Sequence, residues 1–267
     1  MLRSILALLW QYQRAIIEVR MNFAQTSLIR YFWVLPVIYL FATIFLLRSQ
    51  VIYVYLVAGV LVVLTIVAQY YARKQAKPDI RLARWLATLA AIGISASIIL
   101  SIEKIELLTE PNHVASCSLS PIVACSPVIA SPQASAFGLP NSFIGIFAYT
   151  AVFTAAMTLA AGAIKLKRVW WRTLLAGVVF GAGFASWLFY QGVFEIGKLC
   201  LYCMLVWLVT FAMLWLTTAY CIEKKHISFG AKLNKLLSHK AELVAITYVI
   251  IFVLLFQRWA DYWVSLL

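Results

Sequence analysis

Residues 200–221 read CLYCMLVWLVTFAMLWLTTAYC, a C-x-x-C motif that leads directly into an uninterrupted apolar run. The run from 203 to 221 falls within the range of about 17–25 residues that a helix needs to cross a bilayer. No charged residue interrupts it. The stretch therefore predicts a membrane helix with two cysteines in its first turn.

Further apolar segments of membrane-spanning character occur along the rest of the chain. They cover residues 31–48, 51–71, 86–102, 143–163, 173–195 and 244–263. The chain is 64% hydrophobic and 12% charged, whereas a soluble domain has about 25% charged residues. We therefore predict an all-α transmembrane protein whose surface faces membrane lipid.

Lysine and arginine are distributed unevenly between the two sides that these spans would create. With a cytoplasmic N-terminus, 18 of the 22 basic residues fall on the cytoplasmic side, as the positive-inside rule requires. We therefore expect a multi-pass protein of the cytoplasmic (inner) membrane. The net charge of +13 resides in short clusters at the ends of apolar runs, so we expect no nucleic-acid partner.

Four regions follow from this topology. Residues 1–30 predict an amphipathic segment at the cytoplasmic interface, with a disordered basic tail as the open alternative. Residues 31–72 predict a tight transmembrane hairpin that serves as scaffold or oligomerisation surface. Residues 222–267 predict a basic cytoplasmic loop and a last span. The fourth region, 86–221, contains the longest loop, 103–141, which would lie outside the cytoplasm and contains five prolines.

The first part of that outer loop is acidic. Glu103, Glu106 and Glu110 lie at helical spacing after the 86–102 segment. We expect them to form a solvated extension of that helix. His113 could assist the deprotonation of a nearby thiol, and the simpler expectation is an exposed loop histidine.

The topology sorts the cysteines into two groups. Cys117 and Cys125 lie in the outer loop, and two crossings later Cys200 and Cys203 emerge on the same side. One further crossing places Cys221 at the cytoplasmic end of its helix, where we expect a small buried side chain. Four cysteines therefore share the oxidising side of the membrane.

The C-x-x-C spacing places Cys200 and Cys203 on one helical face. Backbone N–H groups at a helix N-terminus favour the thiolate, the reactive form of cysteine. A zinc site is disfavoured because the other pair is C-x7-C and two of the three histidines fall on the opposite side. A static disulfide and a pair of buried small residues stay open. A redox relay between the two pairs explains the position of the motif at the membrane boundary best.

Three segments resemble the vitamin K epoxide reductase family. Residues 117–131, CSLSPIVACSPVIAS, resemble its paired loop cysteines and the serine that follows. Residues 138–145, GLPNSFIG, resemble its entry into the next helix, and the C-x-x-C falls where the family has its active site. The resemblance covers roughly residues 86–221. It implies a four-helix bundle around a quinone. The apolar segments outside residues 86–221 predict about three additional transmembrane helices, which the resemblance does not explain.

The resemblance also implies roles for individual residues. Cys117 and Cys125 would pass electrons from an external thiol to Cys200, and Cys203 would face the quinone. The quinone-binding residues implied are Asn141, Ser131 and Trp207. Asn141 would donate a hydrogen bond to a quinone oxygen, with N-capping of the following helix as the alternative. Ser131 is open to a purely structural role in the loop.

Trp207 occupies the position where vertebrate epoxide reductases carry a tyrosine, so its lack of a hydroxyl weakens the case for epoxide chemistry. Many bacterial members carry a thioredoxin-like domain after their last helix, and we expect none here. The expected partner is therefore a separate thioredoxin-fold disulfide oxidase in the extracytoplasmic space.

The predicted function is a quinone-dependent thiol oxidase that supports disulfide formation in exported proteins, with ubiquinone or menaquinone as acceptor. One alternative is a quinone or quinone-epoxide reductase whose main product is the reduced quinone. The other is a non-enzymatic scaffold or transporter with structural disulfides. The 143–163 and 173–194 stretches contain no ionisable Asp, Glu, Lys, Arg or His, which disfavours a proton or ion pathway.

Overall fold

The structure is a computed structural model that describes residues 78–110, 113–118, 120–161, 166–260 and 262. These residues belong to one structural unit, Ala76–Leu267. The predictions for 1–30 and for the hairpin 31–72 fall outside the described residues.

Five helices of the described part are long and apolar enough to cross a membrane. They are α4 (Pro78–Thr109), α6 (Asn141–Ala160), α7 (Arg168–Tyr190), α8 (Leu201–Glu223) and α10 (Lys240–Arg258). Short helices connect them: α5 (Cys125–Ala130), η3 (Pro132–Ser135), η4 (Gln191–Ile196) and α9 (Ala231–Ser238). The prediction of an all-α membrane protein is confirmed.

Helix α4 is longer than the predicted span 86–102. It begins at Pro78, a residue suited to the first helical position because its missing N–H needs no partner there. It ends at Thr109, shortly before Pro111. The outer loop is therefore shorter than the predicted 103–141, and it contains α5 and η3.

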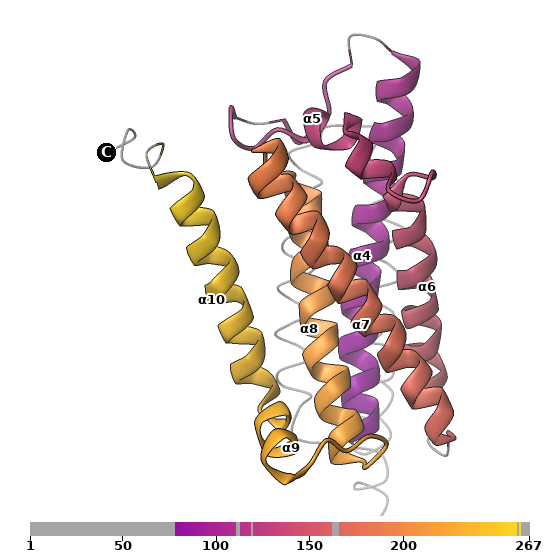
Figure 1. Ribbon diagram of the computed structural model, residues 1–267. Coiled ribbons are helices and arrows are strands. Elements are labelled where there is room, and N and C mark those ends of the chain that lie inside the picture. The colour runs from indigo at the N-terminus through magenta and orange to yellow at the C-terminus, as the bar shows by residue number, and fades with distance from the viewer. Residues whose placement is uncertain (1–77, 111–112, 119, 162–165, 261, 263–267) are drawn as a thin grey trace, which may run out of the picture. The chain divides into compact units, whose positions relative to one another are not determined.

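Helices α4 and α8 form the interior of the bundle, and α6, α7 and α10 lie around them (Figure 1). In the most apolar windows, 67% of α4 and 61% of α8 is buried, against 17% of α6 and none of α10. Helices α4 and α6 approach closely at Gly93, where an added Cβ would lie 2.7 Å from the ring of Tyr149. The exposed apolar surface of the outer helices is what a lipid-facing helix presents.

A buried polar contact joins α4 and α8 at the end of the bundle away from Cys200. The Tyr220 hydroxyl donates to the carboxylate of Asp79, and Lys224 lies 3.4 Å from the same carboxylate. Cys221 is fully buried beside this contact. The prediction that Cys221 is a small buried side chain is confirmed.

At the end of the bundle that carries Cys200, α7 continues into the π-helical turn η4. The sequence patterns did not predict this turn. Gly197 ends this turn with φ +69°, a conformation that glycine adopts without strain. The chain then reverses through Lys198 and Leu199 and reaches Cys200, where α8 begins.

Candidate active site

The loop between α4 and α6 holds two of the predicted cysteines in a disulfide. Cys117 and Cys125 are bonded, and both are almost completely buried. Cys125 is also the first residue of α5. The loop therefore folds as a cap over one end of the bundle (Figure 1).

A short backbone pairing attaches this cap to the segment before α8. Val123 and Leu199 form a parallel β-bridge. Leu199 N donates to Ile122 O at 2.8 Å, and Ala124 N donates to Leu199 O at 2.9 Å. Because the two segments run parallel, the pairing brings the residues that follow them, Cys125 and Cys200, to the same place.

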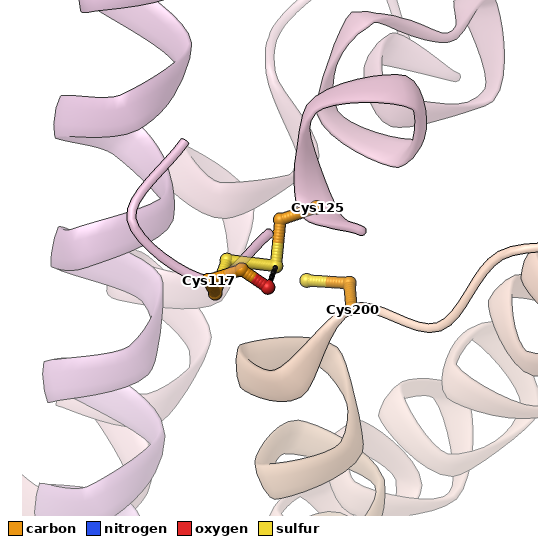
Figure 2. Close-up of side chains that lie close together, drawn as sticks. All are labelled: Cys117, Cys125 and Cys200. Atoms are coloured by element: carbon orange, nitrogen blue, oxygen red, sulfur yellow. Dashed lines mark hydrogen bonds between the residues drawn. A yellow bond between two sulfur atoms is a disulfide. The ribbon is translucent and has the colours of Figure 1, made fainter. Parts of the chain in front are cut away.

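The result is a cluster of three sulfur atoms (Figure 2). The Sγ atoms of Cys117, Cys125 and Cys200 all lie within 4.8 Å of one another. Cys200 is a free thiol and is buried. Such proximity of a thiol to a disulfide is the requirement for thiol–disulfide exchange. Two of the three sulfurs are consumed by the disulfide, so the oxidised cluster does not offer three thiolates to a metal ion.

The C-x-x-C adopts the predicted position at the start of α8. Cys200 is the N-cap residue, and its Sγ accepts a hydrogen bond from Cys203 N at 3.4 Å. Cys203 is a free, half-buried thiol in the first turn. Cys200 thus lies between the loop disulfide and Cys203.

A cavity of about 210 Å³ lies beside the C-x-x-C, and Cys200 and Cys203 both contribute to its wall. Most of its wall is apolar surface, to which side chains of α4, α6, α7 and α8 contribute, and Lys104 and Lys198 also line it. Ligand pockets of about 300–1,000 Å³ hold drug-sized molecules, so this smaller space suits a compact ring. The predicted quinone-binding residues Asn141, Ser131 and Trp207 all line it.

The family model of the vitamin K epoxide reductase family matches residues 84–218, about half of the chain. The chain belongs to the vitamin K epoxide reductase family. The comparison with curated proteins gives no match. The match covers α4 to α8, which include the disulfide loop, the C-x-x-C and the cavity. Family membership implies an oxidoreductase that couples thiol chemistry to quinone-type substrates.

In this family member, the Asn141 side chain serves the loop. Its Nδ2 donates to Gln133 O at 2.7 Å, and its Oδ1 accepts from Ala136 N at 3.1 Å. The residue before α6 is Pro140, and no side chain caps that helix end. The alternative of N-capping by Asn141 is therefore wrong. An amide carries two N–H donors, and the second has no acceptor among the described residues.

Ser131 and Trp207 take different positions on the cavity wall. The Ser131 hydroxyl donates to Val128 O at 2.7 Å, so its oxygen can accept but its proton is already used. Trp207 is buried and packs edge-to-face on Phe189 with 4.9 Å between ring centroids. Its indole ring gives the wall apolar surface and carries one N–H donor.

Tyr149 of α6 was missed by the sequence reasoning. It lines the cavity, is buried, and its hydroxyl lies 2.6 Å from Thr210 Oγ1 of α8. From a single sequence, an aromatic residue that lines a cavity cannot be distinguished from one that only packs between helices. Only the paired hydroxyl of Thr210 on a distant helix marks it as a polar group of the cavity.

Glu103 corrects another expectation. It was predicted to be solvated, but only 5% of the residue is exposed. Ser116 N donates to its carboxylate at 3.1 Å, and the Ser116 hydroxyl donates to the same oxygen. The physical reason is that the loop folds back over the end of α4 and covers this turn.

His113 is half-buried and paired, where an exposed loop histidine was expected. Its Nε2 lies 3.0 Å from Glu103 and 3.3 Å from Glu106. The hydrogen bond that the His113 ring donates to Glu103 raises the pKa of His113, the nearby charges of Glu103, Glu106 and Glu110 raise it further, and burial opposes them. These acidic neighbours favour the imidazolium, a form that cannot take a proton from a thiol.

Proposed function

We propose that this protein is a membrane thiol oxidase that transfers electrons from a thioredoxin-fold partner to a quinone. Electrons would enter at Cys117/Cys125, pass to Cys200/Cys203 and leave to ubiquinone or menaquinone. The active site would face the extracytoplasmic side, where the partner introduces disulfides into exported proteins. The observation that supports the order is the free Cys200 thiol within 4.8 Å of both sulfurs of the loop disulfide.

The chemistry balances at each exchange. A dithiol partner reduces the Cys117–Cys125 disulfide and becomes a disulfide itself, with its two protons passing to the loop thiols. A loop thiolate then attacks the Cys200–Cys203 disulfide, and the second loop thiol resolves the mixed disulfide. The loop is oxidised again and the C-x-x-C is left as two thiols, which is the combination present in the structure.

The cavity residues fit a quinone headgroup. A bound quinone supplies the acceptor for two electrons and two protons. Cys203 presents its thiol to the cavity, and Asn141 keeps one N–H donor for a carbonyl oxygen. The hydrogen bond would strengthen as negative charge develops on the oxygen, and the largely apolar wall would favour this.

Quinone reduction by a reduced thioredoxin-fold protein, followed by ultraviolet absorbance, tests the proposal. We expect the purified wild type to couple thiol oxidation to quinone reduction with one disulfide formed per quinol. Cys203→Ala should abolish the coupling, and Cys221→Ala should retain it. Equal activity in Cys203→Ala and wild type would refute the proposal.

A further inference from the structure

A buried carboxylate lies behind the cysteine loop, and the relay described above does not use it. Glu103 projects from the last two turns of α4 into the folded-back loop. It accepts hydrogen bonds from the backbone N–H and the hydroxyl of Ser116, and it pairs with His113. Ser116 is covalently adjacent to Cys117.

The few hydrogen bonds to the Glu103 carboxylate should hold the loop firmly. Hydrogen bonds to an ionised acceptor are roughly twice as strong as neutral ones, and a buried carboxylate without partners is very unfavourable. The loop therefore cannot leave Glu103 without exposing or orphaning its charge. The groups that contact Glu103 are His113 and Ser116 of the loop, and the other carboxylates near His113 are those of Glu106 and Glu110.

The Ser116 hydroxyl also lies 3.5 Å from the hydroxyl of Tyr202. Tyr202 is a buried residue inside the C-x-x-C, between Cys200 and Cys203. One hydroxyl thus connects the end of α4, the Cys117 side of the loop and the first turn of α8.

The loop is attached to the bundle on both sides of its disulfide, and Lys104 and Lys198 also donate to its carbonyl oxygens at Ile129 and Pro121. The Val123–Leu199 bridge fixes the segment that leads to Cys125, and the Glu103–Ser116 contact fixes the segment that leads to Cys117. The two attachments use different residues of the loop. A substitution that removes the Glu103–Ser116 contact therefore leaves the backbone bridge at Val123 in place.

We infer that Glu103 is a positioning residue for the internal thiol–disulfide exchange. Through Ser116 it holds Cys117 within reach of Cys200, so that the disulfide is presented to one particular thiol. This inference rests on the exchange step of the proposed function, and it assigns that step a residue outside the four cysteines.

The test uses full-length Cys203→Ala protein without quinone or thiol partner. In this background the Cys200 thiolate can attack the loop disulfide, and a new S–S bond forms between Cys200 and one loop cysteine. The other loop cysteine leaves as a thiolate and takes up the proton that Cys200 lost. Rapid alkylation followed by non-reducing peptide mass spectrometry measures the ratio of this mixed disulfide to the loop disulfide.

We expect Glu103→Ala to lower that ratio by about 10- to 100-fold, the range that a small displacement of reacting groups produces. Glu103→Gln should restore most of it, because the amide oxygen still accepts from Ser116 N. The matched control is Glu106→Ala. Glu106 lies one turn after Glu103 on the same helix, and its carboxylate also pairs with His113. Its carboxylate makes no hydrogen bond to Ser116 among the described contacts. It should leave the ratio unchanged.

A ratio in Glu103→Ala equal to that of its Cys203→Ala parent would overturn the inference. So would equal losses in Glu103→Ala and Glu106→Ala, since the effect would then follow charge near His113. If Glu103→Ala fails to fold, Ser116→Ala serves instead. It removes one donor and should lower the ratio by a smaller factor, and no change would again overturn the inference.

The readout separates this inference from the proposed function. A wild type that reduces no quinone, together with a mixed disulfide that depends on Glu103, would refute the quinone oxidase and support the positioning role. Quinone reduction by the wild type, together with a ratio of mixed disulfide to loop disulfide that Glu103→Ala leaves unchanged, would support the quinone oxidase and refute the positioning role.

Discussion

Val123 and Leu199 pair through their backbones in a parallel bridge, and this pairing sets the distance between the loop disulfide and Cys200. The bridge itself uses peptide groups, and the side chains of Ile122 and Leu199 pack beside it in a buried apolar cluster. The two cysteine pairs, which belong to different connections, thereby become one redox unit.

Leu199→Pro should weaken this unit. Proline lacks the N–H that Leu199 donates to Ile122 O. We expect the mixed disulfide in the Cys203→Ala background to decrease by an order of magnitude or more. Leu199→Ala keeps the backbone donor and should match its parent, so a similar loss in both variants would assign the effect to the side chain instead.

The buried contact at the other end of the bundle should affect stability and leave the chemistry intact. Asp79→Ala leaves the buried Tyr220 hydroxyl without its acceptor, which costs about 1–3 kcal/mol. We expect a lower thermal unfolding midpoint in detergent and an unchanged ratio of mixed disulfide to loop disulfide. A change in that ratio would mean that the two ends are coupled.

Cys221 should be dispensable for electron transfer. It is fully buried near Trp171 and Tyr220, at the end of α8 opposite Cys200. We expect Cys221→Ala to keep full quinone reduction, and Cys221→Ser to lower the unfolding midpoint because a hydroxyl replaces a thiol in a tight site. Loss of activity in folded Cys221→Ala protein would contradict the assignment of the chemistry to the other four cysteines.

The loop should become less stable as the pH rises through the pKa of His113. Because the folded-state pKa lies above the ordinary value of 6.5, the imidazolium stabilises the fold fully below about 6.5, and this contribution disappears as the pH rises through the raised pKa. The difference in unfolding midpoint between wild type and His113→Gln should therefore be largest at low pH. A difference that grows toward alkaline pH would have the wrong sign.

Much of this architecture could be predicted from sequence. The five described spans follow from apolar length, and the placement of Cys200 and Cys203 at the start of α8 follows from the motif. Those features depend on local composition. The extension of α4, the π-helical turn η4 and the burial of Glu103 depend on how the outer loop folds back on the bundle.

The candidate site shows the same division. The four cysteines and the three predicted lining residues could be chosen from motifs and from a family resemblance, and all seven border the sulfur cluster or the cavity. The hydrogen bonds of Asn141 and the Tyr149–Thr210 pair could not be predicted. The Asn141 bonds depend on how the chain turns between η3 and α6, and the Tyr149–Thr210 pair joins helices far apart in the sequence, and a single sequence specifies neither.

The order of the relay is tested most directly by quinone reduction in a Cys117→Ala/Cys125→Ala variant with two different reductants. Dithiothreitol is small enough to reach the C-x-x-C, so we expect it to drive quinone reduction in the variant as in the wild type. A reduced thioredoxin-fold protein should drive it in the wild type only. Equal rates with the protein reductant in variant and wild type would contradict the passage of electrons through Cys117 and Cys125.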